Sequence, residues 1–122
     1  MQIYIENGYS LEFIIISADE SLDLSAYGTF KEATSIAQHN PLFMAIVVDF
    51  NQTEKLFDSG MAMLLTLRQL SGRLKNRIYL THVNPSLFKQ LKQYGLSNKF
   101  LINQQPGELL KTAILINLQQ TA

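Results

Sequence analysis

Residues 42–70 read LFMAIVVDFNQTEKLFDSGMAMLLTLRQL and carry the most specific pattern in the chain. The apolar run at residues 43–48 predicts a strand that is buried on both faces, as in the centre of a parallel sheet. A long apolar helix follows, and we expect Asp58 or Ser59 to accept backbone N–H bonds from its first turn. Gly60 in that turn allows another part of the chain to approach closely. A strand that leads through a polar turn to a helix N-terminus is typical of sites for anions and partners.

Composition excludes several classes of protein. The 122 residues suffice for one domain with a substantial core, and we expect no second domain. Ten Lys and Arg residues balance ten Asp and Glu residues, so no overall positive charge favours nucleic acid. Cysteine is absent, which excludes disulfides, thiolate zinc sites and cysteine nucleophiles. No apolar run reaches the roughly 18 residues of a membrane span, and the N-terminus lacks the order of a signal peptide, so we expect a soluble cytoplasmic protein.

The N-terminal part of the chain predicts a hairpin and then an acidic connection. Residues 2–6 and 11–17 are expected to pair as antiparallel strands around a turn at Asn7-Gly8, because Asn-Gly is a strong hairpin signal. The connection at residues 18–24 is rich in carboxylates, which a solvated loop explains most simply.

The rest of the chain alternates helices and strands. A helix is expected with Ser25 as its N-cap and with its end at Asn40-Pro41. Its buried stripe is Tyr27, Phe30, Ala33 and Ala37. The later elements are a helix at residues 60–74, a strand at 77–83, a helix between Asn84-Pro85 and Gly95, a strand at 100–102 and a helix at 107–118. On the helix after residue 84, one apolar face is formed by Leu87, Phe88, Leu91 and Tyr94.

This order predicts a single α/β domain over residues 1–122. We expect a mixed, mainly parallel sheet with an N-terminal β-hairpin and about four helices packed on it. Val47, Leu64 and Leu67 are expected in the core, because they lie on the apolar strand and on the helix that follows it.

Residues that could carry enzyme chemistry are few. The two histidines, His39 and His82, stand at the end of a helix and of a strand without a motif around them, so we expect both to be structural. No histidine pair has metal-binding spacing, and neither a regular acidic loop nor a glycine-rich phosphate loop is present. We therefore expect no catalytic residue, no metal, no cofactor and no enzymatic activity.

The order of elements and the turn together resemble the STAS domain family, the bacterial anti-sigma factor antagonists, over nearly the full length. The segments that carry this resemblance are Leu22-Asp23-Leu24, Val48-Asp49-Phe50, residues 60–68 (GMAMLLTLR), residues 80–85 (LTHVNP) and residues 91–96 (LKQYGL). The resemblance implies the STAS fold and a regulatory domain that binds proteins in signal transduction and transcription regulation.

At the turn, the chain departs from the family pattern Asp-Ser-Ser/Thr-Gly, in which a partner kinase phosphorylates a serine. Without a gap, Phe57 falls on the family's Asp and Asp58 on the phosphorylated serine. A one-residue deletion would instead make Ser59 the acceptor. We prefer the ungapped alignment because it also places Asp49 on the aspartate of the family's preceding strand. Aspartate carries one negative charge where phosphoserine carries about −1.5 to −2, so Asp58 imitates the modified state only in part.

The resemblance implies an anti-sigma factor antagonist whose partner is an anti-sigma factor of the ATP-binding serine-kinase type. Binding would sequester the partner and free a sigma factor, and phosphate on the turn would abolish binding. The residues expected to bind the partner are Asp23, Phe57, Asp58, Ser59, Gly60 and Met61. Phe57 is the expected anchor if its ring is exposed. With Asp58 in place of the serine, binding is expected to be constitutive.

Two alternatives stay open. The first is a STAS domain associated with a lipid or ABC transporter, or one that binds a small ligand, where loss of the phosphoserine is no anomaly. The second is a degenerate receiver domain, in which Asp19, Glu20 and Asp49 would hold Mg²⁺ and Asp49 would accept phosphate. Asn103 stands where a receiver domain needs a lysine, which counts against this alternative.

Overall fold

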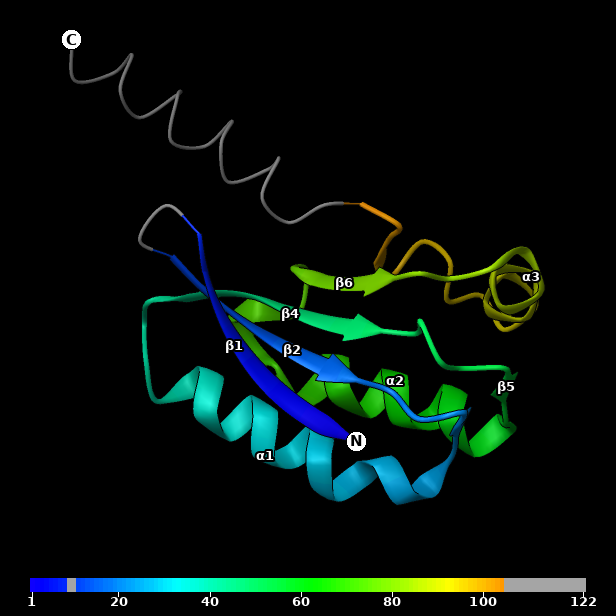
Figure 1. Ribbon diagram of the computed structural model, residues 1–122, viewed down its shortest axis with the longest axis horizontal. Helices are drawn as coiled ribbons and strands as arrows, with labels where there is room; N and C mark the ends of the chain where they lie inside the picture. Colours follow the sequence, from blue (N-terminus) through cyan, green and yellow to red (C-terminus); the bar gives the residue numbers. More distant parts are fainter. Residues whose placement is uncertain (9–10, 105–122) are drawn as a thin grey trace, which may run out of the picture.

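The computed structural model describes residues 1–8 and 11–104, in which a five-stranded sheet packs on two helices (Figure 1). The sheet has the order β1-β2-β4-β6-β7, and only β1 and β2 are antiparallel. A second sheet pairs β3 with β5 in parallel. The strands are β1 (Gln2–Gly8), β2 (Leu11–Ser17), β3 (Ser21–Leu22), β4 (Phe43–Asp49), β5 (Lys55–Leu56), β6 (Ile78–Thr81) and β7 (Leu101–Ile102).

Three α-helices and two 3-10 turns connect these strands in the described part of the chain. They are η1 (Leu24–Ala26), α1 (Tyr27–Gln38), α2 (Asp58–Leu70), η2 (Gly72–Leu74) and α3 (Pro85–Gln93). Helices α1 and α2 lie side by side on one face of the sheet, and α3 lies at the end where β4 and β6 finish (Figure 1). The helix predicted at residues 107–118 falls outside the described residues. Among the helices that the structure describes, none is long and apolar enough to cross a membrane.

Strand β4 is the centre of the sheet and is buried on both faces, as its sequence predicts. Val48 packs toward the helices, in the cluster that contains Leu64 and Leu67. Val47 points the other way and belongs to a cluster on the opposite face, with Phe13, Ala45 and Tyr79. The three predicted core positions are confirmed, since Val47 is 5% exposed and Leu64 and Leu67 are 0% exposed.

The predicted hairpin is present, but its turn is not at Asn7-Gly8. Asn7 and Gly8 continue β1 and pair with Glu12 and Leu11, and residues 9–10 lie outside the described residues. The pairing of the isoleucines in the two strands sets this register, and the register outweighs the local turn signal of Asn-Gly.

The start of the first helix also differs from the prediction. Asp23, not Ser25, is the N-cap residue, and it caps the 3-10 turn η1, with α1 beginning only at Tyr27. Tyr27 therefore lies in the first helical turn and is 44% exposed, not buried. The remaining stripe residues are buried as predicted, namely Phe30, Ala33 and Ala37.

Candidate functional site

The start of α2 is fixed against strand β3 by one hydrogen bond and one close contact. The Phe57 N–H donates to the carbonyl oxygen of Leu22 at 3.1 Å. A Cβ atom added to Gly60 would lie 2.2 Å from the same oxygen, so only glycine fits without a shift. The close approach predicted for Gly60 is confirmed, and it holds the turn before α2 in one position.

Replacing Gly60 with alanine is expected to lower the free energy of unfolding by about 1–3 kcal/mol, as at other overpacked sites. The new methyl group meets the backbone of β3, which cannot rotate away as a side chain can. Urea unfolding measures the loss, with Gly28→Ala in α1 as the matched control, because a Cβ at Gly28 meets nothing within 4 Å. A Gly60→Ala protein as stable as Gly28→Ala would contradict the contact.

No side chain caps the first turn of α2. Phe57 occupies the N-cap position and makes no side-chain capping bond. The predicted capping by Asp58 or Ser59 is wrong, because the helix begins at Asp58 and both residues lie inside its first turn. The Asp58 carboxylate instead accepts a hydrogen bond from the hydroxyl of Tyr94, 36 residues further along the chain.

Burial divides the residues predicted to contact a partner into two groups. Phe57 is 48% exposed, Asp58 is exposed and Ser59 is half-buried. Gly60 is buried, and Met61 is 2% exposed. The prediction that Gly60 and Met61 touch a partner does not fit this burial, because Gly60 faces the backbone of β3 and Met61 belongs to the core cluster. These two residues position the turn.

Asp23 lies beside this turn, because it follows the Leu22 residue that is bonded to Phe57. Its carboxylate accepts hydrogen bonds from the Ser25 hydroxyl at 2.6 Å and the Ser25 N–H at 2.9 Å. The bond from the hydroxyl, and then the bond from the N–H, hold the pKa of Asp23 below its ordinary value. The carboxylate is therefore ionised at neutral pH and oriented by η1.

Leu24 and Tyr94 are exposed residues of the same region that the sequence analysis did not place among the partner-binding residues. Leu24 is 64% exposed in η1, which packs against α2. Of the four residues predicted on one face of α3, Leu87 and Leu91 are buried, whereas Phe88 and Tyr94 are 41% and 49% exposed.

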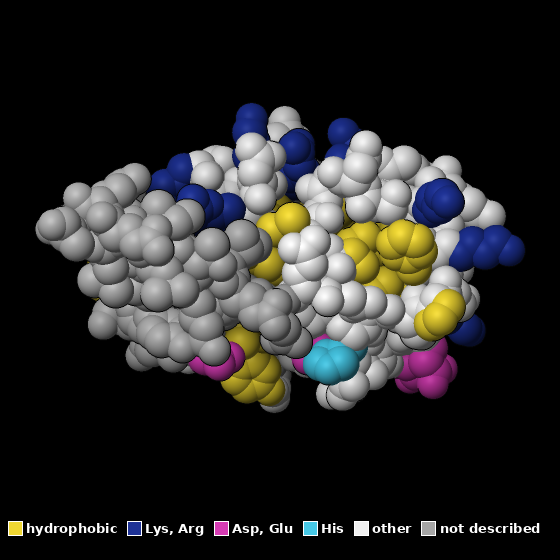
Figure 2. Space-filling model, turned by 90° about the horizontal axis from the view of Figure 1, so that it is seen from above, with side chains coloured by type: hydrophobic (Ala, Val, Ile, Leu, Met, Phe, Trp, Pro, Cys, Tyr) yellow, Lys and Arg dark blue, Asp and Glu magenta, His cyan; other side chains and the backbone are white. Residues whose placement is uncertain are grey.

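At the end of the molecule that carries α3, hydrophobic side chains are exposed and bordered by lysine and arginine (Figure 2). We define the turn surface as Asp23, Leu24, Phe57, Asp58, Ser59 and Tyr94.

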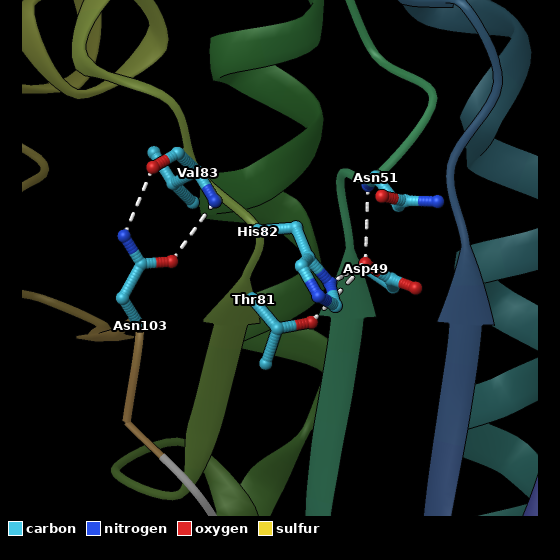
Figure 3. Close-up of polar contacts among 6 residues, drawn as sticks. All are labelled: Asp49, Asn51, Thr81, His82, Val83 and Asn103. Atoms are coloured by element: carbon cyan, nitrogen blue, oxygen red, sulfur yellow. Dashed lines mark hydrogen bonds and ion pairs between the residues drawn. The ribbon is translucent and has the colours of Figure 1, made fainter.

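A second polar cluster lies where β4 and β6 end (Figure 3). One oxygen of Asp49, Oδ1, lies 2.7 Å from His82 Nδ1. The same oxygen accepts hydrogen bonds from the Thr81 hydroxyl at 3.3 Å and the Asn51 N–H at 3.1 Å. His82 thus joins the ends of two strands, and His39 Nδ1 lies 2.6 Å from a backbone carbonyl oxygen of α1.

Strand β7 ends beside β6 at the same end of the sheet, and the residues that follow it help to form a cavity of about 330 Å³. The cavity is lined by Thr81, His82, Asn103 and Gln104. The Asn103 side chain accepts from the Val83 N–H and donates to the Val83 carbonyl oxygen, both at 2.9 Å, and so ties the ends of β6 and β7 together (Figure 3). His82 and Asn103 both have φ of 55°, which turns the chain sharply away from each strand.

The acidic cluster that a receiver domain requires is not formed. The Asp19 carboxylate pairs with the N-terminal amino group of Met1 at 3.2 Å. Across residues 1–8 and 11–104, no three His, Cys, Asp or Glu side chains come together to hold a metal ion. Asn103, at the position where a receiver needs a lysine, is bonded to Val83. This geometry removes the basis of the receiver alternative.

Comparison with known proteins gives similarity in structure only. No protein-family model matches the chain, and no curated protein gives a significant match to its sequence. A variant of RsbS from Moorella thermoacetica, with glutamate in place of one serine, matches with a TM-score of 0.69 at 18% identity and covers 96% of this chain and 99% of its own. The unphosphorylated anti-sigma factor antagonist SpoIIAA gives 0.65 at 14% identity, with coverage of 92% and 96%.

A third similar structure is an anti-sigma factor antagonist from Mycobacterium paratuberculosis, with a TM-score of 0.61 at 15% identity and coverage of 91% of this chain and 92% of its own. All three structures extend over nearly the whole chain. The sheet of this chain confirms the predicted mixed, mainly parallel architecture, and the similar structures share its fold. The chain therefore has the STAS fold of the anti-sigma factor antagonists.

Proposed function

We propose that this protein is a non-enzymatic anti-sigma factor antagonist that binds an anti-sigma factor of the ATP-binding serine-kinase type through the turn surface. The fold supports this role, since the similar structures include anti-sigma factor antagonists. The observation that carries the proposal is the exposure of the Phe57 ring, 48%, at the start of α2. An aromatic residue that is about half exposed beside a polar turn can contribute a large share of the binding free energy at a protein interface.

The turn is suited to binding because its backbone is already ordered. Phe57 is bonded to Leu22, and Gly60 packs against the same residue, so docking need not fix a mobile loop. Ordering a loop on binding subtracts from affinity, and a rigid turn avoids that cost. Leu24 extends the apolar surface from the neighbouring 3-10 turn.

The mechanism is competition for the anti-sigma factor. Binding to the turn surface sequesters the anti-sigma factor and leaves a sigma factor free. Asp58 gives the turn one permanent negative charge at the position of the phosphorylated serine in the ungapped alignment. We propose that binding by this protein is constitutive.

Phe57→Ala is expected to weaken binding by about 30-fold or more, the loss of roughly 2 kcal/mol that defines an interface hot spot. The partner is the kinase recovered with the wild-type protein from native cells and identified by mass spectrometry. Affinity is then measured by calorimetry with the purified kinase. Leu42→Ala is the matched control, because Leu42 is 51% exposed but precedes β4, at the end of that strand opposite to the turn surface (Figure 1).

Equal affinity of the Phe57→Ala and Leu42→Ala proteins would contradict the proposal. Recovery of a lipid or nucleotide with the purified protein, and of no kinase, would favour the alternative of a ligand-binding or transporter-associated STAS domain. The cavity at the ends of β6 and β7 is the place to look for such a ligand.

A further inference from the structure

Tyr94 is held in place by the end of α3 and not by its contact with Asp58. Its N–H donates to the Gln90 carbonyl oxygen at 3.2 Å, and Gly95 then turns the chain away with φ of 72°. Leu91 and Leu96 are buried on either side of this turn. The backbone of Tyr94 is therefore fixed by the core, while its ring is 49% exposed and extends toward α2.

The contact between the two side chains joins elements that are distant in the sequence. Tyr94 donates its hydroxyl hydrogen to Oδ1 of Asp58, the first residue of α2. An ionised carboxylate can only accept hydrogen bonds, so it needs donors when water is removed. Tyr94 supplies one donor from within the chain.

Docking on the turn surface would remove water from Asp58. A carboxylate that loses water without gaining donors carries a large free-energy cost, whereas a serine at this position carries no charge and a much smaller cost. A phenol that stays bonded to the carboxylate during docking replaces one of the lost contacts with water. The partner then has fewer donors to provide.

We infer that Tyr94 is a positioning residue for partner binding, which makes a carboxylate acceptable at the position where the antagonist family has a serine. This inference rests on the proposed function. It extends the determinants of specificity to the end of α3, and it requires Tyr94 and Asp58 to act as one unit. The hydroxyl of Tyr94 matters only when residue 58 is charged.

The test is a double-mutant cycle on affinity for the same purified kinase. Tyr94→Phe keeps the ring and removes only the hydroxyl. It is expected to weaken binding about tenfold when residue 58 is Asp, the effect of one hydrogen bond to a charged group. In the Asp58→Ser background, measured without ATP, the same change is expected to alter affinity by less than about twofold, because the group to be satisfied is neutral.

Tyr4→Phe is the matched control for loss of an exposed tyrosine hydroxyl. Tyr4 is also 49% exposed, and its hydroxyl donates to the side chain of Gln2 within β1. This variant is expected to bind as the wild type does. Equal losses from Tyr94→Phe in both backgrounds, or no loss in either, would overturn the inference alone, since Tyr94 would not act through Asp58. A wild-type protein that binds no kinase of this type would overturn the proposed function and the inference with it.

Discussion

Leu64→Ala is expected to lower the free energy of unfolding by about 2–5 kcal/mol, through lost transfer free energy and the cavity that remains. Leu64 is 0% exposed and belongs to the cluster between α2 and the helix-facing side of β4. Close packing on all sides leaves little room for the neighbours to move into the gap. Urea unfolding followed by circular dichroism, with linear extrapolation to water, measures the change.

Leu65→Ala is the control for this measurement, because Leu65 is the next residue of the same helix and is 42% exposed. The two variants remove the same atoms and change helix propensity equally, so their difference reports burial alone. Leu65→Ala is expected to change stability by about 0.5 kcal/mol or less. A loss below roughly 1 kcal/mol for Leu64→Ala would contradict the burial of this face of α2.

Asp58→Ser is expected to convert a constitutive binder into one that ATP releases. The partner kinase would phosphorylate the new serine, and the resulting dianion would meet a surface that accepts a neutral hydroxyl or a single charge. Burying the second negative charge without a compensating group on the partner costs several kcal/mol, which is a loss of affinity on the order of 100-fold or more. The measurement is affinity for the kinase with and without ATP, together with mass spectrometry of the turn.

Asp58→Ala and Ser59→Ala test separately whether position 58 or Ser59 accepts the phosphate group. Neither variant has a serine at position 58, so both are expected to keep their affinity when ATP is added. The wild type is expected to behave in the same way. Phosphorylation of the wild type on Ser59, followed by release, would contradict the ungapped alignment and the proposal of constitutive binding.

Local rules were sufficient to predict the order of the five strands of the main sheet and of the three described α-helices, and several of their ends. Asn84 caps α3 by accepting from the Leu87 N–H at 2.8 Å, and Gly95 stops the same helix with φ of 72°. Both signals act within one helical turn, so neighbouring residues decide them. The apolar run of β4 likewise identified the central strand, because burial on both faces requires apolar residues at successive positions.

Contacts between distant parts of the chain were decided only in the folded protein. Strands β3 and β5 have two residues each, too few for an alternating pattern to be visible in the sequence. The Tyr94 to Asp58 bond spans 36 residues, and it depends on where α3 ends relative to the start of α2. The sequence therefore predicted the place of the candidate site. The packing of α2 and α3 decided which of its residues are exposed, so that Tyr94 lies at the surface and Met61 is buried. Burial could not be read from the sequence, because it depends on which surfaces meet in the folded chain.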